Sequence, residues 1–353
     1  MRIESINRVK TDEILAKNIL TNEGQVLLRS GVRLNQLYID KLKKLGVFYV
    51  YIYDDRLDDI GVEDEKLMEL KQSAIKSMNG IIKNIHSCNG KEFKKSLYNV
   101  ENLIDYIIDN ADVNSSLYDI QTYDNYTFVH CLDTCIMSTF LGITCKYNQF
   151  DIKKLGMAGI LHDIGKIEIP IEILNKNGKL TNDEFAEMKK HPTYGVKLLK
   201  KIVLIPDSVI KAVGQHHERV DGKGYPCGLV SHQISNFAKI ICICDVYDAV
   251  SNDRCYRKKF SPNDAYELIL AGSGTSFDED TVENFKNTFS VYPLGCCVRL
   301  SDGVEGYVVR QNKGFPDRPV VRVLYDINTH NPVPFYEVNL MKNTNIVITK
   351  VAN

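Results

Sequence analysis

Histidines gather in one part of this sequence, and their neighbours suggest metal chemistry. The chain has eight histidines, and five of them fall between positions 130 and 217. Two aspartates accompany them: Asp163 follows a histidine directly, and Asp245 lies within the apolar run KIICICDVYDAV. Imidazole nitrogens and carboxylate oxygens are common ligands of divalent transition metals, so these groups could hold two ions inside a helical bundle. The candidate ligands are His130, His162, Asp163, His191, His216, His217 and Asp245.

The apolar surroundings of these residues favour a metal over a purely structural role. His130 lies in a helical pattern of apolar residues, and His162 follows the apolar run MAGIL. A buried charge without a compensating partner is costly, and a metal ion provides that partner. Each residue alone is weaker evidence. A single histidine such as His130 is often an ordinary core residue, and the pair His216-His217 could lie in a solvated loop.

The histidine-bearing segment, from about residue 117 to 292, is rich in helical apolar patterns. Residues 61–115, which precede it, carry two amphipathic stripes separated at Asn89-Gly90. Such stripes pack either within one domain or between two subunits, so an intradomain core and a homodimer both remain open. The stripe residues are Leu67, Leu70, Ala74, Met78, Ile81 and Ile85 in the first helix, and Phe93, Leu97, Val100, Ile104 and Ile107 in the second.

The two ends of the chain have β-like patterns. Near the N-terminus, residues 25–28 and 47–53 are typical of strands, and residues 35–45 form a helical pattern that Gly46 would end. After Pro293 the short runs CCVRL, GYVVR and PVVRVLY alternate and are separated by Asp302-Gly303, Lys313-Gly314 and prolines. This pattern is typical of a small β-barrel or β-ribbon module.

These patterns predict a mainly α fold, in which a helical bundle is flanked by a small N-terminal α+β module and a small C-terminal β module. The predicted boundaries are 1–60 for the N-terminal module, 61–115 for linker or dimerisation helices, 116–292 for the histidine-bearing catalytic domain and 293–353 for the C-terminal module.

Composition excludes several classes of protein. The 353 residues carry 44 basic and 45 acidic side chains, and this balance argues against electrostatic capture of DNA, RNA or an anionic membrane. No apolar run approaches the roughly 18 residues that a membrane helix needs, and the N-terminus lacks the apolar stretch of a signal peptide. The ten cysteines are dispersed without a CxxC pair, which favours buried free thiols. We therefore expect a cytoplasmic protein.

Four motifs together resemble the HD-GYP family, the bacterial cyclic-di-GMP phosphodiesterases of the HD hydrolase superfamily. They are HDIGK from His162, His191-Pro192, HHERVDGKGYP from His216 and DVYDAVSNDRCYRK from Asp245. The resemblance covers residues 123–289, and the two flanking modules also resemble those of members from Firmicutes. It implies a metal-dependent phosphodiesterase that hydrolyses cyclic di-GMP to pGpG, with further cleavage to GMP left open.

The resemblance also implies roles for individual residues. The first ion would be bound by His130, His162, Asp163 and Asp245, and the second by His191, His216 and His217, with Asp163 bridging. Iron and manganese are the metals that the family implies. A hydroxide bridging the two ions would attack the phosphorus, because divalent cations lower the pKa of bound water toward about 7. Lys166 would contact a phosphate oxygen, and Arg254 and Arg257 would contact the dinucleotide. Cys255 replaces the proline that is common in the motif.

Two other functions remain open at this stage. The same chemistry could act on another cyclic dinucleotide such as cyclic GMP-AMP, because the sequence does not fix base recognition. A non-catalytic cyclic di-GMP receptor is the other alternative. The full ligand set favours the enzyme, because degenerate family members typically lose ligands.

Tyr126 determines the expected number of ions. It stands one helical turn before His130, where family members with a third metal carry glutamate. A tyrosine phenol, with a pKa of about 10, is a poor ligand at neutral pH. Tyr126 would then contact the site or the substrate. We predict two divalent ions per chain, and a third ion in a crystal of the fully loaded protein would contradict this count. Unchanged kinetics in Tyr126→Phe would exclude a role for the hydroxyl.

Overall fold

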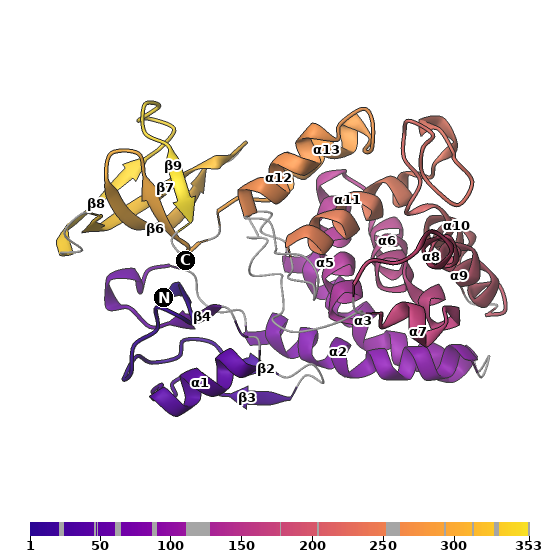
Figure 1. Ribbon diagram of the computed structural model, residues 1–353, viewed down its shortest axis with the longest axis horizontal. Helices are drawn as coiled ribbons and strands as arrows, with labels where there is room; N and C mark the ends of the chain where they lie inside the picture. Colours follow the sequence, from indigo (N-terminus) through magenta and orange to yellow (C-terminus); the bar gives the residue numbers. More distant parts are fainter. Residues whose placement is uncertain are drawn as a thin grey trace. The chain divides into compact units, whose positions relative to one another are not determined.

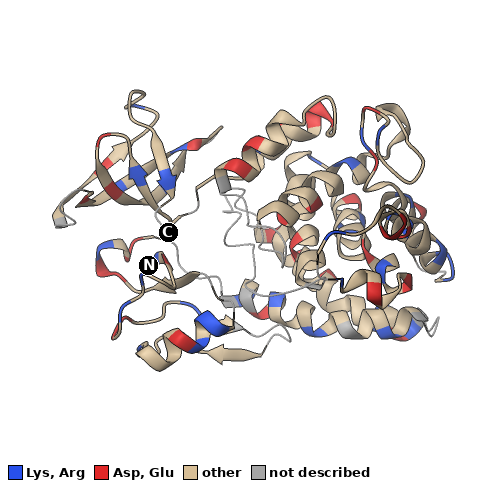
Figure 2. Cartoon of the chain, viewed as in Figure 1, with Lys and Arg blue, Asp and Glu red and all other residues tan. Residues whose placement is uncertain are grey.

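The computed structural model describes residues 1–351 apart from 21–24, 46, 48, 61–64, 87–89, 111–127, 177, 203–204, 252–261, 293, 313 and 328–331. The chain divides into two compact units (Figure 1). The helical unit comprises the described residues of Lys66–Val113 and Tyr126–Thr288, and the terminal unit comprises those of Met1–Glu65 and Phe289–Asn353. The fold is mainly α, as predicted. Basic and acidic side chains are interspersed along both units (Figure 2).

The helical unit is built around α5 (Phe128–Thr144), which is buried along almost its whole length. It packs against α3 (Gly90–Asn110), α6 (Gln149–Leu161), α11 (Asn236–Ser251) and α13 (Glu279–Thr288). A β-carbon at Gly159 would lie 2.8 Å from the Cα of Cys135, so glycine lets α6 approach α5 closely. The remaining helices of the unit are α2 (Glu65–His86), α7 (Ile171–Leu174), α8 (Asn182–Met188), α9 (His191–Leu199), α10 (Asp207–Gln215) and α12 (Pro262–Ala271), with short 3₁₀ turns at Ile164–Glu168 and Ser231–Gln233.

The apolar stripes of α2 and α3 are buried within the helical unit. Ile104 is 1% exposed, and its Cδ1 lies 2.6 Å from the position that a β-carbon of Gly156 would take on α6. Most stripe residues are likewise buried: Ala74, Met78, Ile81, Ile85, Phe93, Leu97, Val100 and Ile107. The structure therefore favours the intradomain alternative, and a homodimer would need another surface.

The N-terminal part of the terminal unit has the predicted strands and helix. β1 (Arg2–Ser5) pairs antiparallel with β4 (Tyr49–Ile52), and β2 (Ile19–Leu20) pairs with β3 (Val26–Leu28). Helix α1 (Gln36–Lys44) begins after Asn35, whose side-chain oxygen accepts a hydrogen bond from the backbone N–H of Tyr38. The predicted helix stop, Gly46, lies outside the described residues. The buried core of this part contains Leu15, Leu34, Ile39, Leu42, Val50 and Ile52.

The C-terminal part is one antiparallel sheet in the order β8-β7-β6-β5-β9. Its strands are β5 (Cys297–Leu300), β6 (Val304–Asn312), β7 (Phe315–Asp326), β8 (Pro332–Asn339) and β9 (Ile348–Val351). The predicted turn at Asp302-Gly303 joins β5 to β6, and Gly303 has a φ of +88°, which favours glycine. The three predicted runs are strands, and β8 and β9 complete the sheet.

The two ends of the chain contact each other within the terminal unit. The backbone N–H of Ile3 donates to the carbonyl of Gly295 at 2.7 Å. Arg8 forms an ion pair with the buried Glu305 at 2.8 Å, and Arg322 forms two hydrogen bonds with Asp59, each 2.7 Å long. The N-terminal and C-terminal modules, predicted separately, are therefore parts of one compact unit. The individual domain boundaries stay predictions.

The described cysteines are free thiols, and most of them are buried, as predicted. Within the described residues, no helix is both long enough and apolar enough to span a membrane.

Truncating the α3 stripe tests whether α2 and α3 belong to the helical core. We expect Ile104→Ala to lower the free energy of unfolding by about 2–5 kcal/mol, because it removes a buried side chain and leaves a cavity. Chemical unfolding of the full chain measures this. Tyr98→Ala, at a 61% exposed position on the same helix, should change it little. A change in oligomeric state without loss of stability in Ile104→Ala would instead indicate that the stripe is a subunit interface.

Candidate metal centre

Five elements of the helical unit bring the predicted ligands together. α5 carries His130 close to its start, and α11 carries Asp245. His162 ends α6, and Asp163 follows it at the start of the 3₁₀ turn Ile164–Glu168. The other ligands lie at helix ends. His191 begins α9 with a proline in its first turn, and His216 ends α10 with His217 directly after it. All seven predicted ligands lie in one cluster.

Three of these residues could form a first metal position. His130, His162 and Asp245 each offer a ligand atom, and these atoms lie within 4.8 Å of one another. The Nε2 of His130 lies 3.0 Å from Asp245 Oδ1, and the Nε2 of His162 lies 3.8 Å from the same oxygen. One imidazole nitrogen from each of two helices thus faces the same carboxylate. This geometry suits a divalent cation bound by nitrogen and oxygen.

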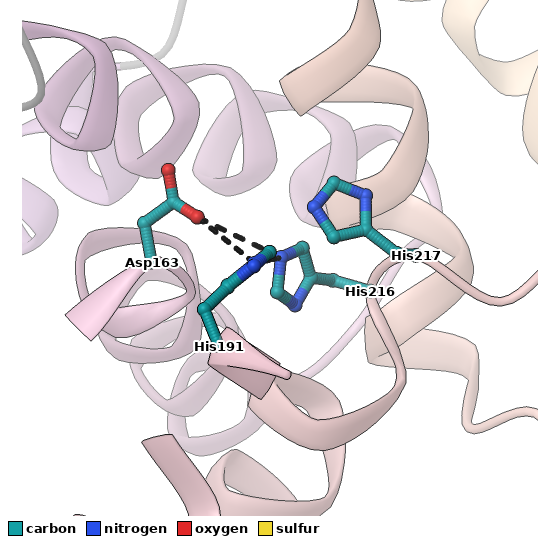
Figure 3. Close-up of side chains that lie close together, drawn as sticks. All are labelled: Asp163, His191, His216 and His217. Carbon is teal, nitrogen blue, oxygen red and sulfur yellow. Dashed lines mark hydrogen bonds and ion pairs between the residues drawn. The ribbon is translucent and has the colours of Figure 1, made fainter. Parts of the chain in front are cut away.

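Four residues could form a second metal position beside the first. The ligand atoms of this second group lie within 4.8 Å of one another, and Figure 3 shows the four side chains close together: Asp163, His191, His216 and His217. The Nε2 of His191 lies 3.3 Å from Asp163 Oδ1, and that of His216 lies 3.9 Å from it. The ring centroids of His216 and His217 are 4.1 Å apart. Three imidazoles and one carboxylate therefore converge here.

Asp163 lies between the two positions. Its Oδ1 faces His191 and His216 of the second position, whereas its Oδ2 lies 3.4 Å from the Nε2 of His162 and 3.8 Å from that of His130. Each carboxylate oxygen therefore faces a different set of imidazoles. A carboxylate that bridges two cations needs this disposition, so the geometry supports the bridging role expected for Asp163.

Hydrogen bonds to the backbone orient three of the imidazoles. The Nδ1 atoms of His162, His191 and His216 lie 2.7–2.9 Å from the carbonyl oxygens of Gly159, Met188 and Val213. Because a carbonyl only accepts, each Nδ1 must carry the proton, which leaves each Nε2 with a lone pair facing the centre. The Nε2 atoms of His191 and His216 are 3.3 Å apart. Two facing lone pairs repel, and a cation between them removes this repulsion.

The electrostatics of the centre keep most ligands in their metal-binding forms. Burial lowers the pKa of His191 and His216, and lowers that of His217 to about 3, so these imidazoles are neutral at pH 7. Burial would raise the pKa of Asp163, but Lys166 and the neighbouring imidazoles outweigh it and hold that pKa well below its usual range. For His130, burial lowers the pKa, but hydrogen bonds to Asp245 and Asp248 outweigh burial and raise it to about 10.

Lys166 lies at the edge of the centre. Its ammonium forms a close ion pair with Oδ2 of Asp163, and its side chain remains 22% exposed. Gly165, directly before it, brings this segment against α9, because a β-carbon there would lie 1.9 Å from the carbonyl oxygen of His191. The HDIGK motif thus places a cation beside the carboxylate that both metal positions share.

The HHERVDGKGYP loop is held by Glu218. Its buried carboxylate accepts hydrogen bonds from the backbone N–H groups of Cys227 at 2.7 Å and Leu229 at 2.9 Å. Gly224 passes so close to Glu218 that a β-carbon would lie 2.5 Å from the latter's Cα. The ring of Tyr225 packs on His217 with 4.7 Å between centroids. Glu218 therefore fixes the conformation of this loop, and Tyr225 packs against the imidazole of His217.

Asp248 contacts the cluster and was not among the residues predicted from the sequence. Its carboxylate lies 2.6 Å from the Nδ1 of His130 and is 1% exposed. The sequence feature that could have identified Asp248 is its position three residues after Asp245, because residues three apart share a helix face. The predicted substrate contacts Arg254 and Arg257, together with Tyr126, lie outside the described residues.

Comparisons with known proteins identify two matching families. Residues 137–281 match the family described as HD domain, and residues 297–353 match the KOW domain associated with HD domain. The cyclic di-GMP phosphodiesterase PA4108 of Pseudomonas aeruginosa is 36% identical over 225 residues, which cover 64% of this chain and 54% of that protein. The 3′3′-cGAMP-specific phosphodiesterase 1 of Vibrio cholerae is 34% identical over 150 residues, which cover 42% of this chain and 35% of that protein. The chain therefore spans about half, or less, of the length of these curated relatives.

One solved structure is also similar. It is Bd1817, an HDG"Y"P protein from Bdellovibrio bacteriovorus, which aligns with a TM-score of 0.54 over 80% of this chain and 97% of that one. Its sequence identity of 17% shows a shared fold only. Together with the curated relatives, these matches confirm the resemblance to the HD-GYP family.

Removing single ligands tests the shared role of Asp163. We expect Asp163→Ala to lose both ions and all turnover, because its two oxygens face both positions. His216→Ala should also lose turnover but retain one ion, because His216 serves the second position alone. Metal analysis after loading with Mn²⁺ measures this, and circular dichroism checks the fold. Asp151→Ala, at the exposed start of α6, is the control. A full metal content in active Asp163→Ala would contradict the shared centre.

Proposed function

The histidine-bearing segment of this chain is an HD domain of the HD-GYP type, and on that premise we propose that the protein is a metal-dependent cyclic-di-GMP phosphodiesterase. The observation that carries this proposal is the pair of buried metal positions that share Asp163. A purely structural metal site would need only one closed set of ligands. Two adjacent cations suit phosphodiester cleavage, because they can stabilise the attacking and the leaving oxygen together.

We propose two divalent ions per chain, with iron or manganese as the metals. Five imidazoles and two carboxylates form the combined ligand set, and mixed nitrogen and oxygen ligation suits both metals. When bound, such ions supply a water that is deprotonated near neutral pH and positive charge beside the scissile phosphate.

The chain's own residues would orient the substrate and balance its charge. Lys166 lies beside Asp163, so its ammonium can reach a phosphoryl oxygen held against the centre. Positive charge at this place stabilises the transition state more than the ground state, since the phosphoryl oxygens gain charge during the reaction. Arg254 and Arg257 are proposed to bind the dinucleotide away from the scissile bond. The product would be pGpG, and GMP if both phosphodiester bonds are cleaved.

A second candidate substrate is cyclic GMP-AMP. It is kept because the 3′3′-cGAMP-specific phosphodiesterase 1 of Vibrio cholerae is 34% identical to this chain, but that match covers 42% of the chain against 64% for PA4108, so cyclic di-GMP is the preferred substrate. Both substrates have the same phosphodiester backbone and differ in one base. The same metal positions could cleave either cyclic dinucleotide, and contacts with the bases would distinguish the two substrates.

A product assay on the metal-loaded full chain tests the proposal. We expect Mn²⁺- or Fe²⁺-loaded protein to convert cyclic di-GMP to pGpG, and chelation to abolish turnover. Parallel assays with cyclic GMP-AMP rank the two substrates by kcat/KM. A loaded, folded protein that binds cyclic di-GMP without cleaving it would instead support a receptor.

Lys166→Ala separates substrate contact from metal binding. We expect the metal content to stay near that of the wild type and turnover to fall by about 10²- to 10³-fold, the loss typical of removing one charge-stabilising donor. Metal analysis and steady-state kinetics on one preparation measure both. Lys176→Ala, which removes a surface ion pair with Glu184, is the matched control. Loss of metal with unchanged activity per loaded enzyme would overturn the role of Lys166.

A further inference from the structure

We propose that Asp248 is a positioning residue that makes the metal position of His130, His162 and Asp245 the tighter of the two. This inference rests on the proposed function, because it concerns the same two ions. It adds an order of binding: the first ion occupies the position beside His130, and the second occupies the position of His191, His216 and His217.

The contact between Asp248 and His130 links two helices. Asp248 extends from α11, one turn after Asp245, and its Oδ2 lies 2.6 Å from the Nδ1 of His130 on α5. Both carboxylates are buried, at 1% exposure for Asp248 and 6% for Asp245. The His130 ring therefore lies between two carboxylates of one helix, with Asp248 hydrogen-bonded to Nδ1 and Asp245 Oδ1 3.0 Å from Nε2. This fixes the ring in the orientation that offers Nε2 to a metal.

The other oriented imidazoles of the centre have weaker partners. His162, His191 and His216 each direct Nδ1 at a neutral backbone carbonyl, at 2.7, 2.9 and 2.8 Å. A carboxylate partner carries a full negative charge, and a charge-assisted hydrogen bond is roughly twice as strong as a neutral one. It also makes the opposite nitrogen a better donor to a metal. Of these four imidazoles, His130 has the anionic partner, and it belongs to the first position, which it shares with the carbonyl-bonded His162.

The first position also has more negative charge around it than the second. Asp163 is common to both, since one of its oxygens faces each, and the one positive charge of Lys166 pairs with Oδ2, on the side of the first position. The first position has in addition Asp245 Oδ1 at 3.0 Å from His130 and Asp248 behind the same ring. At the second position the corresponding contact is weaker, because Asp245 Oδ2 lies 3.7 Å from the Nδ1 of His217. More negative charge in a buried site attracts a divalent cation more strongly.

Stepwise titration of the metal-free full chain with Mn²⁺ tests the inference without substrate. Free Mn²⁺ gives an electron paramagnetic resonance signal that bound Mn²⁺ loses, so the two affinities can be measured in turn. We expect two distinct dissociation constants in the wild type. Asp248→Asn preserves the size of the side chain but removes its charge. It should weaken the tighter constant by about 10- to 100-fold, the usual effect of losing such a partner, and change the weaker constant less than threefold.

A double-mutant cycle assigns the effect to the contact with His130. The His130→Gln variant lacks the imidazole. Adding Asp248→Asn to it should therefore raise the Mn²⁺ dissociation constants by less than threefold over those of His130→Gln alone. Glu283→Gln, on the exposed face of α13, is the matched charge control and should leave both constants unchanged. Circular dichroism of each variant confirms that the helices remain folded.

The outcomes separate this inference from the proposed function. Two equal constants in the wild type, or an equal loss of both constants in Asp248→Asn, would overturn the inference and leave a two-metal enzyme intact. An additive effect of Asp248→Asn in the His130→Gln background would also overturn it. A folded wild-type chain that binds no Mn²⁺ would overturn the inference and the proposed function together.

Discussion

The centre depends on one constraint: a buried carboxylate, Asp163, with a set of imidazole lone pairs on each side. The ammonium of Lys166 compensates part of the buried charge, but the facing lone pairs have no such partner among the contacts described and would be stabilised by a positive charge. The Nε2 atoms of His191 and His216 lie 3.3 Å apart while their Nδ1 atoms are committed to backbone carbonyls. Cations on the two sides of Asp163 satisfy both features at once.

The rest of the helical unit holds this arrangement in place. α5, α6 and α11 form an apolar core that fixes His130, His162 and Asp245, and α3 closes the outer face of α6 through Ile104. Two close approaches require glycine: Gly165 brings the shared carboxylate against α9, and Gly224 brings the loop against Glu218. The terminal unit is a separate compact body whose two ends contact each other through ion pairs such as Arg8 with Glu305.

Much of this was predictable from the sequence. The residue types at the seven ligand positions, the helix start at His191-Pro192 and the β runs after residue 293 are local features, and a local pattern is enough to identify them. Contacts between distant segments were not predictable in the same way. The contact of Asp248 with His130, which lies 118 residues away along the chain, depends on how α5 and α11 pack. The contact between the terminal modules, and the choice of core over dimer for the α3 stripe, likewise depend on packing.

Anomalous diffraction from crystals of the Mn²⁺-loaded protein tests the central claim most directly. We predict two manganese peaks, one beside His130, His162 and Asp245 and one beside His191, His216 and His217. Each ion should contact a different oxygen of Asp163. A single ion, or two ions that do not both bind Asp163, would contradict the account.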